Sequence, residues 1–285
     1  MTTLLELRTR TYSILSEPST SSLYPDESGD FYVTDTINQV IDRICNQYAW
    51  SFLESEAFFD AVSKTTLTTD LSTVDTTISV ASTTGFATSG KVMIDQDVIS
   101  YTGKTATTFT GVTGISATHA AGSYVEYLYP LPTDFSRFLL TTGKLSSGLR
   151  WDKVDYAPWY EYPNSDFVRL VTFSENHSVI RFRETRGQFL FRYFRSPTVL
   201  SADSDVCTIP APHALDIVPV YAAGWMMKVK GDDLDGLGSE KIQIAESLIQ
   251  KMAAKYTHKD SFGAMVRTKY SAFDSYKRAS IPHIH

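Results

Sequence analysis

The stretch KVMIDQDVISYTGKTATTFTGVTGISATHAAGSYV, residues 91–125, is rich in threonine, glycine and β-branched residues. Its first part predicts a β-hairpin that turns at Asp95 and Gln96. In this register Val92 pairs with Ile99, and the alternation of a strand gives the hairpin two distinct faces. One predicted face carries Val92, Ile94, Ile99 and Tyr101, and the other carries Lys91, Met93, Val98 and Ser100.

The hairpin belongs to a longer segment, residues 63–128, in which about four residues in ten are Ser or Thr. Such a composition favours strands and disfavours helices, so this segment predicts a small all-β domain. A second β-rich segment follows over residues 129–205, with strand patterns in RFLLTT, FVRLVTF, VIRFRE and FLFRYFR. The run RETRGQFLF predicts a hairpin through Gly187.

Helical periodicity appears on both sides of these β-rich segments. Helices are predicted over residues 3–16, 34–54, 213–230 and 239–257. Thr3 and Glu6 have the spacing of a capping box, Thr34 or Asp35 is expected to cap the second helix, and Ser239 the last.

These patterns predict an α+β fold in which the N- and C-terminal helices form one helical bundle around an inserted β domain. The expected division has five parts: 1–62, the N-terminal part of the bundle; 63–128, the inserted β domain; 129–205, the second β-rich segment; 206–258, a C-terminal helical hairpin; and 259–285, an extended C-terminal arm.

Composition narrows the range of functions. The chain has 285 residues and a net charge of −6, which argues against a protein held on nucleic acid by many phosphate contacts. Cys45 and Cys207 are expected to be buried thiols of a reducing compartment. Charged residues near the N-terminus argue against a signal peptide, and the most apolar run, 214–227, is too short to span a membrane.

Motifs for catalysis or metal binding are missing from the sequence, and no catalytic residue, metal or cofactor is predicted. GDDLDGLGSEKI lacks the first and last ligands of an EF-hand loop, and no P-loop, G-x-G-x-x-G or G-x-S-x-G occurs. His119, His177, His213 and His258 lack ligand spacing, so solvated or packing roles are expected. Glycoside hydrolysis needs a pair of carboxylates, and the sequence does not show which residues would form one. The candidates by residue type alone are Glu54, Glu56, Asp60, Glu126 and Glu161.

The run FLFRYFRS, residues 189–196, combines aromatic and basic residues, as single-stranded nucleic-acid surfaces do. Alternation places Phe189, Phe191 and Tyr193 on one face of a strand. An ordinary buried strand is the preferred interpretation.

Three segments resemble the head-to-tail connector (adaptor, or head-completion) proteins of tailed bacteriophages. TISVASTTGFATSGKVMIDQDVISYTGKTATTFTGVTGISATHAAGSYV is similar to a β-module inserted in virion proteins, although Asp95-Gln96 replaces its usual Asp-Gly and Thr113-Gly114 its Arg-Gly. YPLPTDFSRFLL resembles the step after such inserts, and residues 208–256 resemble the closing helical hairpin of the family.

The resemblance implies a structural virion protein of the neck, not an enzyme. Such a protein forms a homo-oligomeric ring of about 12 subunits beneath the portal protein, continues the DNA channel without sequence-specific binding, and presents a docking surface to the next neck or tail protein. It is made in the host cytoplasm, is not bound to a membrane, and resides at the head–tail junction of the virion, where it acts at the end of viral genome packaging.

The basic, aromatic C-terminal stretch is the predicted portal-binding arm, since such tails order against partners. Its expected contact residues are Phe262, Arg267, Lys269, Tyr270, Phe273, Tyr276, Lys277 and Arg278.

Two alternative functions remain open at the level of sequence. The first is a tail or baseplate protein whose β-module binds a host glycan, which exposed aromatic residues in the insert would favour. The aromatic residues of the insert are Phe86, Tyr101, Phe109, Tyr124 and Tyr127, of which Tyr101 and Phe109 are expected in the core. The second is a virion glycan hydrolase, which needs a carboxylate pair.

Overall fold

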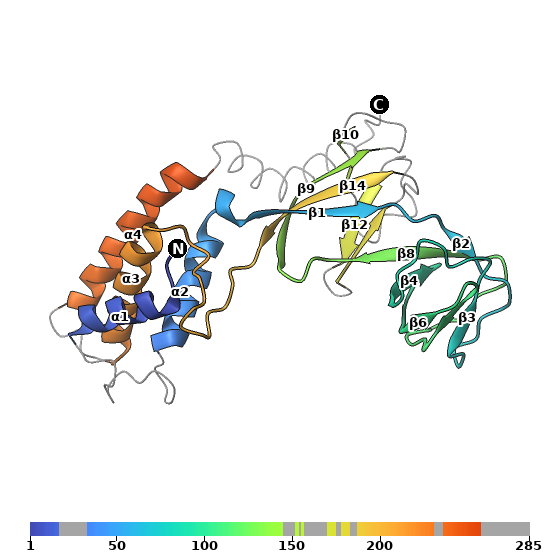
Figure 1. Cartoon of the computed structure of the whole chain (residues 1–285), viewed down its shortest axis with the longest axis horizontal. Coiled ribbons are helices and arrows are strands. Elements are labelled where there is room, and N and C mark those ends of the chain that lie inside the picture. Colours follow the sequence, from blue (N-terminus) through green and yellow to red (C-terminus); the bar gives the residue numbers. More distant parts are fainter. Residues whose placement is uncertain are drawn as a thin grey trace, which may run out of the picture. The chain divides into compact units, whose positions relative to one another are not determined.

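The computed structural model describes residues 1–16, 33–144, 152–153, 155–156, 170–174, 178–182, 187–230 and 236–257 (Figure 1). The fold is mixed α+β, as predicted, with four α-helices and three β-sheets among these residues. The chain divides into a helical unit, Met1–Glu54 with Phe194–His285, and a β-rich unit, Ser55–Tyr193. The predicted arm, 259–285, lies outside the described residues, and the five-part division stays a prediction.

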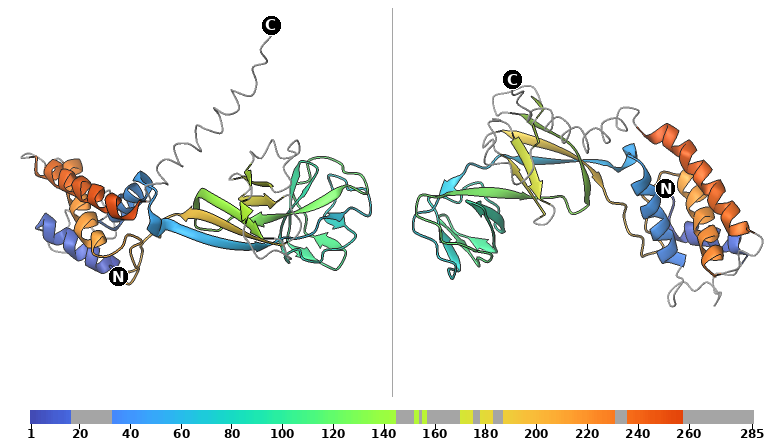
Figure 2. Two further views of the ribbon diagram at one scale, coloured as in Figure 1. Left: turned by 90° about the horizontal axis from the view of Figure 1, so that it is seen from above. Right: turned by 180° about the vertical axis from the view of Figure 1, so that it is seen from behind.

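The helical unit contains α1 (Leu4–Leu15), α2 (Val33–Gln47), the short 3-10 helix η1 (Ser51–Leu53), α3 (His213–Lys230) and α4 (Leu237–Tyr256). Helix α3 packs along α4 and also contacts α1 and α2 (Figures 1 and 2). The predicted capping box of α1 is confirmed: the Glu6 carboxylate accepts from Thr3 N at 2.9 Å, and the Thr3 hydroxyl accepts from Glu6 N at 3.4 Å.

Two predicted helix boundaries are wrong. Helix α2 runs over Val33–Gln47 and not over 34–54, so neither Thr34 nor Asp35 precedes it as a cap. The buried indole of Trp50 donates to the Ile44 carbonyl at 2.7 Å, which satisfies a carbonyl of the last turn by a side chain. Helix α4 begins at Leu237, so its N-cap is Gly236, in the left-handed conformation at φ 73°, and not Ser239.

Helices α3 and α4 approach each other closely at a glycine. A Cβ atom at Gly224 would lie 2.7 Å from the Gly238 carbonyl oxygen and 3.0 Å from Lys241 Cβ. No ordinary side chain can occupy that space without moving the helices apart. The core beside this contact is formed by buried residues of all four helices, among them Leu7, Ile41, Ile44, Ile217, Val218, Ala222, Ile249 and Met252.

The β-rich unit is built on strands of three sheets. The strands are β1 (Glu54–Asp60), β2 (Thr65–Thr66), β3 (Thr77–Ser79), β4 (Gly90–Ile94), β5 (Asp97–Tyr101), β6 (Gly103–Lys104), β7 (Thr108–Thr110), β8 (Tyr124–Pro130), β9 (Phe135–Lys144), β10 (Asp152–Lys153), β11 (Asp155–Tyr156), β12 (Leu170–Ser174), β13 (Val179–Phe182) and β14 (Gln188–Arg195). The sheet orders are β1-β14-β9-β10, β11-β12-β13-β8-β4-β5 with β2 on β8, and β3-β7-β6.

The predicted hairpin is confirmed as β4 and β5, with Val92 opposite Ile99 and Ile94 opposite Asp97. Of the two turn residues, only Asp95 has a positive φ, 54°, so Gln96 avoids the conformation that it disfavours. The predicted faces are also confirmed. Val92, Ile94, Ile99 and Tyr101 lie in the core of the insert, and Met93 and Val98 pack on the other side.

Strand β8 joins the two predicted β segments. β8 pairs with β2 at its start and with β4 from Val125 to Leu128, and it pairs with β13 at Tyr129 and Pro130. Figure 1 shows β8 running from beside β2 and β4 toward β12. Val125 lies in the core of the insert, Tyr129 lies in the second β core, and Tyr127 packs against both. The predicted boundary between residues 128 and 129 therefore falls inside a strand.

The predicted hairpin through Gly187 is wrong. Strand β13 pairs with β12 and β8, whereas β14 lies between β1 and β9 in another sheet. The rings of Phe182 and Phe189 stack with centroids 4.0 Å apart, so the two strands meet through side chains across the core and not through a ladder of backbone hydrogen bonds.

We expect the substitution Gly224→Ala to destabilise the helical unit by about 1–3 kcal/mol, because the added methyl group meets the α4 backbone. The measurement is chemical denaturation followed by circular dichroism at the helical band, since all described α-helices belong to this unit. Ser247→Ala on the exposed face of α4 is the control and should change stability by less than about 0.5 kcal/mol. Equal stability of the Gly224→Ala variant and the wild type would contradict the close contact.

Candidate functional site

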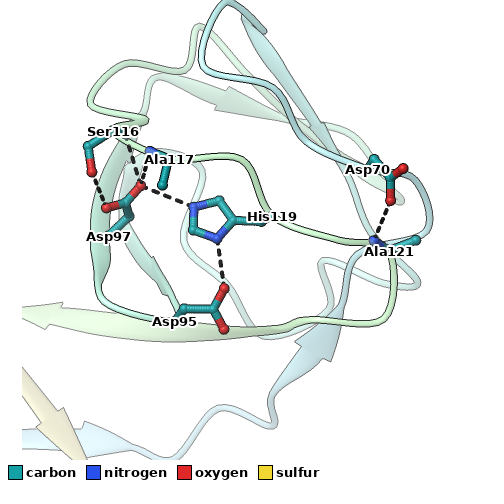
Figure 3. Close-up of polar contacts among 7 residues, drawn as sticks. All are labelled: Asp70, Asp95, Asp97, Ser116, Ala117, His119 and Ala121. Atoms are coloured by element: carbon teal, nitrogen blue, oxygen red, sulfur yellow. Dashed lines mark hydrogen bonds and ion pairs between the residues drawn. The ribbon is translucent and has the colours of Figure 1, made fainter.

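A cluster of ionisable side chains lies beside the β4–β5 turn (Figure 3). His119 is almost fully buried, with 4% of its side chain exposed, and its ring lies between two carboxylates. Its Nδ1 is 2.7 Å from Asp95 Oδ2, and its Nε2 is 3.0 Å from Asp97 Oδ2. The loop that carries His119 is also held by its backbone, which pairs with Leu71 in both directions at 2.8 and 2.9 Å.

Asp97 is the most heavily hydrogen-bonded member of this cluster. Burial alone would raise its pKa, but the Ser116 hydroxyl, the backbone N–H groups of Ser116 and Ala117 and the His119 ring together lower the pKa to about 2. The two backbone groups donate to Asp97 Oδ2 at 2.9 and 3.0 Å, and the hydroxyl donates to Oδ1. Asp97 is therefore ionised throughout the ordinary pH range.

The cluster contains a serine, a histidine and an aspartate, but these residues are not arranged as in a catalytic Ser-His-Asp triad. In that geometry the hydroxyl donates to a ring nitrogen of the histidine. Here the Ser116 hydroxyl donates to Asp97, and both ring nitrogens of His119 face carboxylates. The cluster ties the 116–119 loop to the β4–β5 turn, and its chemistry is that of a structural clamp.

Sequence reasoning did not identify this cluster. Of the two roles expected for His119, solvated or packing, its burial fits the second, but its two carboxylate partners were not predicted. The sequence does contain a D-x-D pattern at Asp95 and Asp97 and an S-x-x-H pattern at Ser116 and His119. These patterns do not show that the second segment folds back onto the first. Within the described part of the chain, no group of three or more His, Cys, Asp or Glu side chains could hold a metal ion.

Glu126, one of the five carboxylates considered for glycan hydrolysis, lies in a buried ionic group. Arg181 of β13 donates from Nε and Nη2 to Glu126 Oε2, both at 2.6 Å, and Lys64 is paired with Oε1. Arg181 and Glu126 expose only 8% and 13% of their side chains. These contacts hold the residue-64 segment, β8 and β13 together, so this carboxylate has a structural role.

Two of the other four carboxylates, Glu56 and Asp60, are engaged by other partners in the β-rich unit. Glu56 is bound at the surface by Arg192, with Nη2 2.6 Å from Oε1, and Asp60 accepts from Gln188 at 3.1 Å. Glu54 belongs to the other unit, and Glu161 lies outside the described residues.

The strand FLFRYFR shows the buried pattern preferred for it. Phe189, Phe191 and Tyr193 are buried in the second β core, and Arg192 is exposed and bound to Glu56. The aromatic residues therefore do not form an open platform on which bases could stack.

Two adjoining cavities lie along the end of β8 and share Leu131 and Ser178. Their volumes are about 460 Å³ and 420 Å³. Among the described lining residues, the ionisable side chains are Lys91 and Tyr127, and none of these residues carries a carboxylate or an imidazole. Among the described lining residues, the serine hydroxyls therefore have no carboxylate or imidazole beside them in either cavity.

Both cysteines are buried free thiols, as predicted. Burial raises the pKa of Cys207 to about 11, an effect only partly offset by a backbone hydrogen bond from Ile209. A thiol with such a pKa is a poor nucleophile near neutral pH.

All eight predicted residues of the portal-binding arm, from Phe262 to Arg278, lie outside the described residues. The structure therefore neither brings them together nor separates them. The part of the chain that the structure describes contains no helix of the length and apolarity needed to cross a membrane.

The substitution Glu126→Gln should destabilise the β-rich unit by about 3 kcal/mol, because it removes the carboxylate charge that binds Arg181 and Lys64 in this group. Glu56→Gln is the matched control. It removes a Glu–Arg pair in which both side chains are more than 40% exposed, so the expected loss is at most about 1 kcal/mol. Denaturation followed by near-ultraviolet circular dichroism compares the two, and equal losses would contradict a structural role for the buried group.

Cys207 should react slowly with a thiol reagent in the folded protein at pH 7–8 and faster as the pH rises toward 11, where the thiolate forms. Mass spectrometry after timed labelling checks this expectation. The same protein in denaturant is the control and should label fully at pH 8. Rapid labelling of folded protein at pH 7 would contradict the burial.

The sequence matches no protein-family model and no curated protein.

Proposed function

We propose that this protein is a head-to-tail adaptor of a tailed bacteriophage, a structural virion protein that forms a ring beneath the portal. The observation that supports it most directly is the division of the chain. The N-terminal 54 residues and the residues from Phe194 onward form one unit, and the β-rich residues 55–193 are inserted between them. This is the helix–insert–helix order of the connector proteins that the sequence resembles.

The proposal includes the predicted bundle of N- and C-terminal helices. Contacts of α3 with α1 and α2 support it, because they join helices that are separated by more than 150 residues of sequence. In the ring, this helical part would carry the assembly contacts, and the β-rich unit would lie at the periphery, where it could touch neighbouring subunits or tail components.

The charge of the chain fits a channel through which DNA passes without binding. A net charge of −6 on each subunit, repeated around a ring, gives a like-charged wall that repels the DNA backbone. The C-terminal arm has the opposite character, with basic and aromatic residues that could anchor in a groove of the portal. We therefore assign the portal contact to the arm and the docking of the next neck or tail protein to the assembled ring.

A host-glycan-binding tail or baseplate protein is the alternative, and Tyr124 is the observation in its favour. Its side chain is 65% exposed and borders a small cavity of about 150 Å³ with Met93, Asp95 and Glu126. Phe86, Tyr101 and Phe109 are buried in the core of the insert, and Tyr127 is partly buried. A single exposed ring offers little surface for stacking a sugar.

The test is binding to the purified portal ring of the same virion. The full chain should be monomeric alone and should form a ring on the portal, as measured by analytical ultracentrifugation. Deletion of residues 260–285 should leave the helical circular-dichroism signal unchanged and abolish binding, because the arm supplies the aromatic and basic anchors.

The control variants separate the parts of the proposal. Alanine at Phe262, Tyr270, Phe273 and Tyr276 should weaken binding as strongly as the deletion, whereas Tyr124→Ala in the insert should not. If the truncated protein binds the portal as well as the full chain does, the portal-binding role of the arm is refuted, but the proposed ring is not. No portal binding by the full chain, or a stable ring at low concentration without portal, would refute the assembly proposed here.

A further inference from the structure

The exposed side of α3 next to α2 carries an indole ring with an arginine beside its face. Trp225 is 39% exposed, and Val229, one turn further along the same side of α3, is 48% exposed. The Arg43 guanidinium of α2 lies 5.9 Å from the centroid of the Trp225 ring and 5.5 Å from that of the Tyr221 ring. We call Arg43, Trp225 and Val229 the tryptophan surface.

The arginine of the tryptophan surface is oriented but is not used up by its contacts. Its side chain is 51% exposed, and its Nη2 is 3.9 Å from Glu246 Oε1, which is longer than a hydrogen bond. The same oxygen accepts from the Tyr221 hydroxyl at 3.0 Å. The two aromatic rings therefore hold the guanidinium in place, and its donors remain able to bind a carboxylate of a partner. Arginine and tryptophan are the residues most enriched where interfaces gain their binding energy.

A second apolar surface lies on α4. Leu237 and Ile244 are 50% and 48% exposed, and they lie about two turns apart on one side of the helix. Leu248 extends this row, and with Ile244 and the exposed Glu240 it lines a shallow groove of about 300 Å³. We call Leu237, Glu240, Ile244 and Leu248 the leucine surface.

The two surfaces lie on different flanks of the α3–α4 pair. Ile244 and Glu246 are two residues apart in one helix, which places their side chains about 200° apart around its axis. Glu246 faces Tyr221 and Arg43, so Ile244 points away from the tryptophan surface. One copy of the chain can therefore present the two surfaces to two different neighbours. Contacts of this head-to-tail kind generate a ring when the rotation between copies closes.

The two surfaces are complementary in chemistry. Each has exposed apolar side chains beside one charged group, and these groups have opposite sign, the Arg43 guanidinium on one surface and the Glu240 carboxylate on the other. The bordering charges are opposite as well, because the exposed Asp42 precedes Arg43 and Lys251 lines the groove of the leucine surface. A guanidinium and a carboxylate form a two-bond contact that fixes the register of an interface.

We propose that the tryptophan surface of one copy of this chain binds the leucine surface of the next copy, with Arg43 paired to Glu240 and Trp225 packed against Ile244. The inference rests on the proposed function in that a ring needs contacts between copies, and it assigns that contact to named surfaces of the helical unit. A second copy is the occupant because the chain itself supplies both complementary halves. The contact is weak in the free protein, since copies with a net charge of −6 repel one another.

Cross-linking between two cysteine variants tests the pairing without the portal. Full-length Val229→Cys and Ile244→Cys, mixed at high protein concentration and treated with a short bismaleimide, should give a covalent dimer that joins positions 229 and 244, as identified by peptide mass spectrometry. Each variant alone should give no more dimer than the wild type, whose buried Cys45 and Cys207 set the background. No 229–244 cross-link in the mixture would overturn the proposal. So would a dimer of Ile244→Cys alone, which would mean that α4 pairs with α4.

Charge reversal is the second test. Arg43→Glu in the Val229→Cys copy should lower the yield of the cross-link about tenfold or more, because two carboxylates then meet. Glu240→Arg in the Ile244→Cys copy should restore the yield, a rescue that a folding defect does not produce. Arg10→Glu on the exposed side of α1 is the matched control and should leave the yield unchanged.

The outcomes separate this contact from the adaptor function. An unchanged yield with Arg43→Glu, or no rescue by Glu240→Arg when circular dichroism shows both variants folded, would overturn the contact. If Arg43→Glu does not fold, the cross-link without charge reversal still decides. A full chain that forms the 229–244 cross-link but does not bind the portal would refute the adaptor function and leave the contact standing.

Discussion

The β-rich unit depends on one strand having neighbours from two different segments of the chain. β8 hydrogen-bonds to β4 within the Thr-rich insert and to β13 beyond it. Along one face of β8, Val125 enters the core of the insert, Tyr129 enters the second β core, and Tyr127 packs against both. At the middle of the strand, Glu126 is bound by Arg181 and Lys64, so the backbone ladder is reinforced by a buried ionic contact. Because burial of these charges is favourable only when all are paired, the three segments are held in one relative register.

The helical unit has a comparable constraint of a different kind. Its helices come from two distant parts of the chain, and α3 packs against α1, α2 and α4, with Leu215, Trp225 and Val229 remaining exposed. The close approach at Gly224 lets α3 and α4 pack backbone to side chain, which a larger residue would prevent. An inserted β-rich unit is compatible with this core because the chain leaves the helices at Glu54 and returns at Phe194.

The polar clusters that resemble active-site chemistry serve mainly to hold loops and strands. The His119 cluster binds a loop to a turn, and Glu126 joins strands, so the reactive groups are engaged by one another.

Local patterns in the sequence determined the α+β class, the capping box of α1, and the register and faces of the β4–β5 hairpin. Each follows from interactions within a few residues: side-chain periodicity, a cap three residues away, or a two-residue turn. Tertiary structure alone decided that α2 ends at Gln47 with help from Trp50, that β13 and β14 lie in different sheets, and that His119 meets Asp95 and Asp97. These outcomes depend on which distant segments pack together. A buried ring or charge contacts whatever group the tertiary structure brings beside it, and local sequence spacing does not show which group that is.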